Sequence, residues 1–114
     1  MRVLFCGDRN WTDRDKIAAA FDRLQPSLVI EGEARGADTL AREEAERRGI
    51  PVLSFPANWK QYGRAAGPIR NRQMLSEGRP EYVCGFHSSI EASSGTRDML
   101  NQARRLGVPW ELVE

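Results

Sequence analysis

The sequence predicts an α/β protein, a three-layer single domain over residues 1–114 with a five-stranded, mainly parallel sheet and about four helices. Short apolar runs alternate with longer stretches of helical period, which is typical of parallel strands joined by crossover helices. The chain of 114 residues is 40% hydrophobic, enough material for one core. No linker, repeat or low-complexity tract divides it.

The predicted strands are short runs rich in valine, isoleucine, leucine and aromatic residues. They occupy residues 2–6, 28–30, 52–55, 82–86 and 110–113. Trp110 begins the last strand and is expected to lie in the core.

The predicted helices fill the stretches between these strands, where apolar residues recur at spacings of three and four. Cap and stop residues bound them. The first begins after an N-cap at Thr12 or Asp13 and stops before Pro26, and the second ends at Gly49. The third spans about residues 65–77, and the fourth follows Gly95 and stops at Gly107.

Composition and charge exclude several classes of protein. The 17 Lys plus Arg against 16 Asp plus Glu give a formal net charge of +1, which argues against a nucleic-acid partner but leaves room for a local basic patch. No apolar run approaches the roughly 20 residues of a membrane span, and the first residues do not form a signal peptide. We therefore expect a cytoplasmic protein with no membrane partner. Cys6 and Cys84 have no metal ligands at a suitable spacing, so free buried thiols and no metal site are expected.

Arginine makes up 15 of the 17 basic residues. Two explanations stay open, coding bias in a GC-rich genome and the grip of planar anions by guanidinium groups. The arginines within predicted helices fit coding bias and solvent exposure. Four others, Arg9, Arg35, Arg70 and Arg72, gather at one end of the predicted sheet and fit a local anion site.

A functional site is expected at the carboxyl ends of the strands, where a parallel sheet covered by helices leaves a crevice. The loops that meet there are residues 7–12, 31–38, 56–67 and 87–96. The first loop has a single glycine, Gly7, and so lacks the three-glycine fingerprint of a dinucleotide site, and no Walker-type phosphate loop occurs. We therefore expect no standard cofactor.

Two of these loops end at helix starts suited to an anion. Gly32 and Gly36 let the backbone turn closely into the second helix, and Ser94, Gly95 and Thr96 open the fourth. Free N–H groups at such starts favour a phosphate. A polar loop with Ser94 as a simple N-cap is the alternative explanation of the second feature.

Charged residues at helix starts allow two explanations each. Asp38, in the first turn of the second helix, could cap that helix or contact a ligand. Arg70, Asn71 and Arg72 occupy the first turns of the third helix, where cations oppose the macrodipole. Either a ligand phosphate or a carboxylate of a neighbouring element is expected to compensate them.

Aromatic residues and the single histidine complete the candidates. Trp11 and Trp59 fall in loops that flank the crevice and could stack on a base or ribose, and Tyr62 could join them or the core. His87 follows the fourth strand, where a general acid or base could act, although a lone histidine is more often structural.

Five short motifs follow one another through these loops: Gly7-Asp8-Arg9-x-Trp11-x-Asp13, Glu31-Gly32-x-Ala34-Arg35-Gly36-Ala37-Asp38, Pro56-Ala57-x-Trp59, Ala66-Gly67-Pro68-Ile69-Arg70-Asn71-Arg72-x-Met74 and Ser94-Gly95-Thr96-x-Asp98-Met99. Together they closely resemble the YspA-like, YpsA-related branch of the SLOG superfamily, over nearly the whole chain. The resemblance implies a Rossmann-like fold that binds nucleotides or nucleotide-derived ligands, in sensing or processing. Relatives commonly pair, so it also implies a homodimer.

More distant relatives, the LOG-type phosphoribohydrolases, cut the N-glycosidic bond of a nucleoside monophosphate with R-K-x-x-M and P-G-G-x-G-T-x-x-E motifs. Arg70 and Met74 match the first motif, but Asn71 stands in place of its lysine. Gly95 and Thr96 match part of the second motif.

The catalytic glutamate of that second motif is replaced by Met99, whose thioether cannot assist departure of the base or attack of water. The adjacent Asp98 is turned by about 100° around the helix and should point elsewhere. A catalytic carboxylate would therefore have to come from another loop, with Asp8, Glu33 and Asp38 as candidates.

The leading hypothesis is a module that binds a nucleotide or nucleotide-derived phosphate ligand at the carboxyl ends of the strands. The predicted ligand-binding residues are Gly7, Asp8, Arg9, Trp11, Gly32, Arg35, Gly36, Asp38, Trp59, Arg70, Asn71, Arg72, Ser94, Gly95 and Thr96. Two alternatives stay open: a nucleotide hydrolase of the phosphoribohydrolase type, and an interaction domain with a vestigial crevice.

Overall fold

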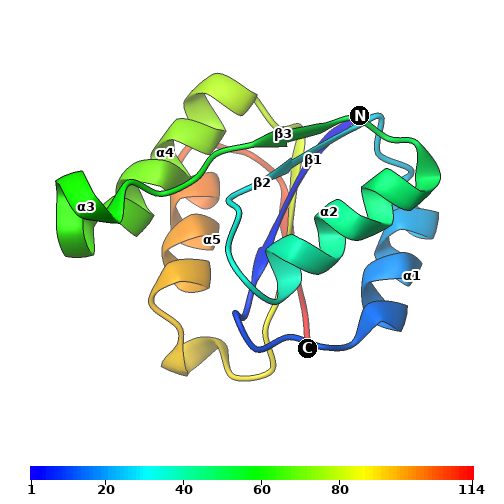
Figure 1. The fold of residues 1–114 in the computed structure, drawn as a ribbon, viewed down its shortest axis with the longest axis horizontal. Helices are drawn as coiled ribbons and strands as arrows, with labels where there is room; N and C mark the ends of the chain where they lie inside the picture. The colour runs from blue at the N-terminus through cyan, green and yellow to red at the C-terminus, as the bar shows by residue number, and fades with distance from the viewer.

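A computed structural model describes residues Met1–Glu114 and contains one five-stranded, all-parallel sheet. The strand order is β3-β2-β1-β4-β5 (Figure 1). The strands are β1 (Arg2–Gly7), β2 (Leu28–Glu31), β3 (Val52–Ser54), β4 (Tyr82–Phe86) and β5 (Trp110–Val113). The predicted α/β class and all five strands are confirmed, with boundaries that shift by one residue at most.

Helices cover both faces of this sheet and make the three layers (Figure 1). Helices α1 (Arg14–Leu24) and α2 (Ala37–Arg48) pack on one face, while α4 (Ala66–Gly78) and α5 (Gly95–Arg105) pack on the other. These are the four predicted helices. A further short helix, α3 (Trp59–Tyr62), protrudes from the body and continues through a 3-10 turn (Gly63–Ala65) into α4, and a second 3-10 turn (Ile90–Ala92) precedes α5.

The core has two halves because successive residues of a strand face opposite sides of the sheet. Val3 and Phe5 pack toward α1 and α2, and Leu4 and Cys6 pack toward α4 and α5. Phe5 stacks on Phe21 of α1 with ring centroids 4.7 Å apart. Burying an aromatic pair of this kind contributes several kcal/mol to folding, of order 3 to 5 per phenylalanine by truncation.

The two cysteines lie in neighbouring strands but on opposite faces of the sheet. Strand β4 pairs with β1 so that Cys84 is opposite Phe5, and Cys6 therefore points the other way. Both thiols are free and buried, as predicted. Burial raises the pKa of Cys6 well above its ordinary value and that of Cys84 to about 12.

The prediction that Trp110 lies in the core is wrong, since its side chain is 42% exposed. It is the first residue of β5, which is an edge strand of the sheet. An edge strand has a neighbour on one side only, so a large side chain at its end finds less cover.

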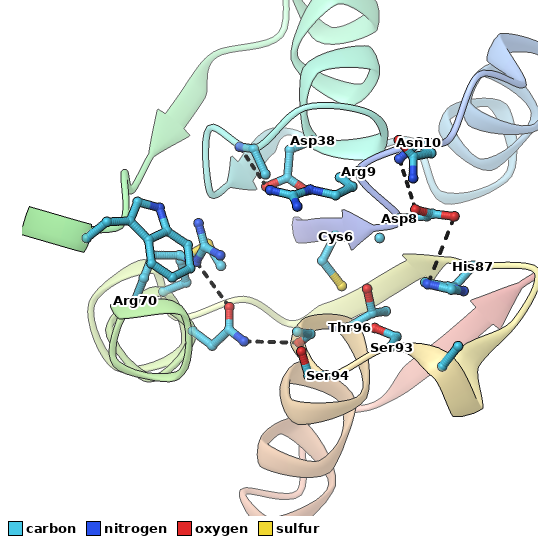
Figure 2. Close-up of a pocket in the computed structure, with 17 residues that line it drawn as sticks. Cys6, Asp8, Arg9, Asn10, Asp38, Arg70, His87, Ser93, Ser94 and Thr96 are labelled. Atoms are coloured by element: carbon cyan, nitrogen blue, oxygen red, sulfur yellow. Dashed lines mark hydrogen bonds and ion pairs between the residues drawn. The ribbon is translucent and has the colours of Figure 1, made fainter. Parts of the chain in front are cut away.

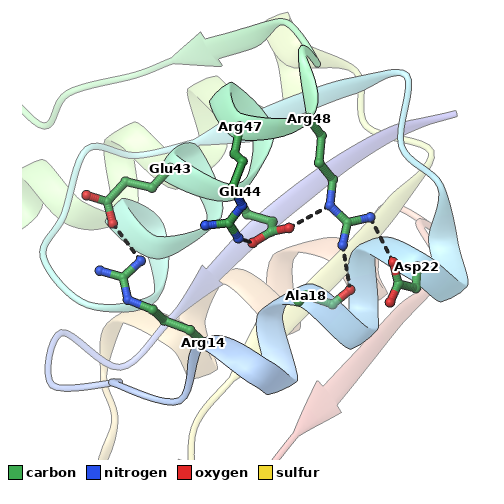
Figure 3. Close-up of polar contacts among 7 residues, drawn as sticks. All are labelled: Arg14, Ala18, Asp22, Glu43, Glu44, Arg47 and Arg48. Carbon is green, nitrogen blue, oxygen red and sulfur yellow. Dashed lines mark hydrogen bonds and ion pairs between the residues drawn. The ribbon is translucent and has the colours of Figure 1, made fainter.

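Arginines on α1 and α2 do more than face solvent (Figure 3). The buried carboxylate of Glu44 accepts hydrogen bonds from Arg47 and Arg48. Arg48 also reaches across to α1, where it pairs with Asp22 at 2.9 Å and donates to the carbonyl oxygen of Ala18 at 3.3 Å. The attribution of all helix arginines to coding bias and solvent is therefore wrong for Arg48, which joins the two helices.

The strand order creates a topological switch point between β1 and β4. Strands β1, β2 and β3 run outward to one edge, and the chain then crosses to the other side of β1 to form β4 and β5. The loops after β1 and β4 consequently lead away from each other at the carboxyl edge. None of the helices has the length and apolar character needed to cross a membrane.

Candidate functional site

A cavity of about 600 Å³ opens at the carboxyl edge of the sheet, beside the ends of β1 and β4 (Figure 2). This is the topological switch point, where ligands bind in open α/β sheets. Its walls come from all four predicted loops and the start of α4. The lining residues are Cys6, Gly7, Asp8, Arg9, Asn10, Ala34, Asp38, Trp59, Arg70, Asn71, Met74, His87, Ala92, Ser93, Ser94, Gly95 and Thr96.

One wall is the loop of residues 7–11, which we call the ridge. Asp8 fixes it in place: its N–H donates to the carbonyl oxygen of Phe86 at 2.8 Å, and its own carbonyl oxygen accepts from Ala37 at 3.1 Å. Its carboxylate accepts from the N–H of Asn10 at 2.9 Å. Gly36 packs directly against the ridge, because a Cβ at that position would lie 2.2 Å from the Asp8 carbonyl oxygen.

The loop after β2 is held by its own carboxylates. The Asp38 carboxylate accepts hydrogen bonds from the N–H groups of Gly32 at 2.9 Å and Ala34 at 3.4 Å. The Glu31 carboxylate accepts from the N–H of Glu33 at 2.8 Å. Asp38 therefore holds the loop in place instead of capping its helix, and we call residues 31–38 the clamped loop. The amides of residues 32–34 are occupied by these bonds and do not serve as anion donors in the cavity.

Asp38 is nonetheless a chemically unusual wall residue. Burial raises the pKa of its carboxyl group from 3.8 to about 7, against the lowering effects of the Arg70 charge and of the two backbone hydrogen bonds. The nearby Glu31 adds to the increase. Glu31 is itself completely buried, and its Oε2 atom has no hydrogen-bond partner.

The start of α4 links two loops of the site. Arg70 donates from Nη1 to the carbonyl oxygen of Gly32 at 2.6 Å and from Nε to the side chain of Asn71 at 3.2 Å. Asn71 in turn donates from Nδ2 to the carbonyl oxygen of Gly95 at 3.2 Å and to Asp98 at 2.9 Å. The sequence predicts that either a ligand phosphate or a neighbouring carboxylate balances the positive charge of Arg70. A neighbouring carboxylate is present: the charge of Arg70 lowers the pKa of Asp38.

The start of α5 is the open helix end of the site. Ser93, not Ser94, supplies the cap, because its hydroxyl oxygen accepts from the N–H of Thr96 at 3.0 Å. Ser94 and Gly95 are exposed and line the cavity, and nothing lies within 4 Å of where a Cβ on Gly95 would be. The positive end of an 11-residue helix therefore faces the cavity.

His87 is a site residue that the predicted ligand set omits. It is buried at the end of β4, and its Nδ1 atom accepts from the N–H of Ser89 at 2.9 Å, so the neutral ring carries its proton on Nε2. That atom lies 4.0 Å from the Asp8 carboxylate. The sequence signal that could have added His87 to the ligand set is its position directly after the fourth strand. The cavity also includes six further residues outside the predicted set: Cys6, Asn10, Ala34, Met74, Ala92 and Ser93.

Several predicted ligand-binding residues, and the catalytic candidate Glu33, lie away from this cavity. Arg72 is exposed on α4, and neither it nor Gly32 nor Glu33 is among the lining residues. Trp11 packs against Phe86 with ring centroids 5.6 Å apart. Trp11, Arg35 and Gly36 line a second pocket on the other side of the ridge.

Of the aromatic candidates, only Trp59 lines the cavity, and its side chain is 59% exposed. Tyr62 is exposed and takes no part in the cavity. An aromatic face that is available to a ligand therefore comes from α3.

The catalytic glutamate of the phosphoribohydrolase motif has no counterpart on α5 of this chain. Met99 is completely buried in the core between the sheet, α4 and α5. Asp98 is occupied by hydrogen bonds from Asn71 and Gln102 and does not line the cavity, in line with its predicted direction. No group of three or more His, Cys, Asp or Glu side chains is placed to hold a metal ion.

Comparison with known proteins agrees with this architecture. The family model described as "YspA, cpYpsA-related SLOG family" matches residues 1–62, which hold the ridge and the clamped loop. The chain is also similar to the Gene 61 protein of Mycobacterium phage D29, with 35% identity over 118 residues, covering 95% of this chain and 92% of that relative. Because the family model covers more than half of the chain and the sheet is Rossmann-like, the chain belongs to the YspA, cpYpsA-related SLOG family.

Proposed function

We propose that the cavity binds a nucleotide or a nucleotide-derived phosphate ligand. The observation that carries this proposal is the position of the open α5 start, which faces the cavity at the switch point of the sheet. Membership of a SLOG family supports a nucleotide-related role. The cavity volume of about 600 Å³ lies within the range of small-molecule sites.

The polar groups suggest how such a ligand lies. A phosphate group sits at the N–H groups that begin α5, at Ser94 and Gly95, where the helix dipole favours negative charge. Arg70 adds a fixed guanidinium charge on the α4 side. Trp59 offers an aromatic face to the base. The ribose then faces the floor of the cavity between Cys6 and Asp38.

Two ligand-binding experiments test the proposal. Isothermal titration with the four nucleoside 5′-monophosphates should give binding for at least one of them. Arg70→Ala should weaken that binding by roughly tenfold or more, because a hydrogen bond to a charged group contributes about 1.5 to 3 kcal/mol. Arg72→Ala is the matched control, since it removes the same side chain from an exposed position of the same helix outside the cavity.

The outcomes separate the proposal from its non-binding alternative. Equal affinities for the two variants would show that the ligand lies elsewhere. The absence of binding by any of the four nucleotides would favour an interaction domain with a vestigial crevice.

A hydrolase of the phosphoribohydrolase type is the second candidate, and one observation favours it. Asp38 lines the cavity with a pKa of about 7, so its carboxyl group can release or accept a proton near neutral pH. In that reaction water adds at C1′ as the bond to the base breaks, and a free base leaves. Base release that disappears in Asp38→Asn, with nucleotide binding retained, would establish the hydrolase, whereas binding without release would leave the binding module.

A further inference from the structure

A second pocket of about 560 Å³ lies on the other side of the ridge. It is a groove between the ridge, the start of α1 and the first turns of α2. Its side chains include three arginines, one glutamate and one tryptophan: Arg9, Arg14, Arg35, Glu43 and Trp11. Nothing in the proposed function uses this groove.

The charges of the groove do not cancel. Arg14 pairs with Glu43 at 3.0 Å (Figure 3). Arg35, which lines only the groove, and Arg9, which lines both pockets, make no ion pair and no side-chain hydrogen bond, so their positive charges are not cancelled. Two guanidinium groups that have no carboxylate partner favour an anion, and their planar forks match phosphate oxygens.

The groove and the main cavity share the ridge as their common wall. Arg9 and Asn10 line both pockets. The ridge between them is held by three backbone hydrogen bonds through Asp8 and by the close packing of Gly36. A fixed ridge keeps the two pockets at a constant separation, which suits a ligand with two anionic groups joined by a short link.

We infer that the groove is a second anion subsite and that the natural ligand spans both pockets. This inference rests on the proposed function and deepens it. The ligand is a nucleotide that carries a second phosphate-bearing group, of which a dinucleotide is the simplest member. One phosphate lies at the start of α5, the chain of the ligand crosses the ridge at Arg9, and the second phosphate pairs with Arg35 in the groove.

The test compares ligands of one and two phosphate-bearing units. Isothermal titration is carried out with the four nucleoside 5′-monophosphates, the four 5′-phosphorylated homodinucleotides and a 20-nucleotide single strand. The best dinucleotide should bind at least about tenfold more tightly than its mononucleotide. Arg35→Ala should remove that advantage and leave mononucleotide affinity within about twofold, because Arg35 lines the groove and not the cavity.

Arg105→Ala is the matched control, an exposed arginine in the last turn of α5 outside both pockets. It should change neither affinity. Arg35 makes no contact that the fold requires, so its variant is expected to remain folded, which the thermal midpoint checks.

Each other result overturns a specific statement. If mononucleotides bind and the dinucleotide gains nothing, or if Arg35→Ala keeps the gain, the second subsite is refuted while the proposed function stands. A 20-nucleotide strand offers many overlapping dinucleotide sites and gains affinity from their number alone. If it binds more tightly than that gain explains, the ligand is a nucleic-acid strand. If neither mononucleotides nor dinucleotides bind, the proposed function itself fails.

Discussion

Gly36→Ala should destabilise the protein strongly, because the ridge leaves no room for a side chain. Gly36 has φ +73° and ψ −124°, a backbone conformation that is essentially restricted to glycine. An L-residue there costs about 1 to 3 kcal/mol. A Cβ would also lie 2.2 Å from the Asp8 carbonyl oxygen and 2.5 Å from the Arg9 carbonyl carbon, so the backbone of the ridge must move. Overpacking of this kind costs a further 1 to 3 kcal/mol or so.

Gly49→Ala separates the two contributions. Gly49 has nearly the same φ, +72°, but lies in the left-handed helical region and has nothing within 4 Å of its Cβ position. Its substitution should cost only about 1 to 2 kcal/mol. Urea unfolding measures both losses. The middles of these two ranges differ by about 2.5 kcal/mol, and in a protein of this size 1 kcal/mol corresponds to roughly 4 °C, so the thermal midpoint of Gly36→Ala should lie about 10 °C below that of Gly49→Ala. Equal losses would refute the argument that the ridge and Gly36 are in fixed contact.

Three further predictions concern the buried ionisable groups. The folded-state pKa of Asp38, about 7, exceeds its ordinary value of 3.8, so the folded state binds more protons between those values. The free energy of unfolding, measured in urea, should therefore fall as pH rises from about 4 to 7, by at most about 1.4 kcal/mol per pH unit. Asp38→Asn should make this dependence on pH weaker. The same dependence in the variant would show that Asp38 is not the group with the raised pKa. Glu31→Gln removes a like charge, so the pKa of Asp38 should decrease in an NMR titration, and an unchanged pKa would show that the two carboxyl groups do not interact. Cys6 and Cys84 are buried and have raised pKa values, so a thiol reagent at pH 8 should modify neither of them in the folded protein. The same reagent should modify both in urea. Rapid labelling of the folded protein would contradict their burial.

Local rules predicted the elements well because they depend on neighbouring residues only. Asp13 is the N-cap of α1, with its carboxylate accepting from the N–H of Lys16, and a left-handed Gly49 ends α2. Trp110 was misplaced because its cover depends on strand order, and its strand is an edge of the sheet.

The candidate site could be located from sequence but not assembled from it. The carboxyl-end rule brought Asp8, Arg70 and Gly95 to one cavity, because it follows from the direction of the strands alone. Which side of the ridge Trp11 faces, and which carbonyl Arg70 meets 38 residues away, depend on packing between elements that no local pattern encodes.

The clamped loop after β2 gives the cavity a direction. Along that wall the amides of residues 32–34 are already hydrogen-bonded to Asp38 and Glu31, and the charge next to them is that of Arg70, which donates to the carbonyl oxygen of Gly32. On the opposite wall the start of α5 presents positive potential. A molecule with one anionic end and one neutral end thus finds backbone N–H donors at the α5 side, whereas the amides on the side of the clamped loop are already occupied. The hydrogen bonds inside one loop thereby decide which end of the cavity still has amides to offer.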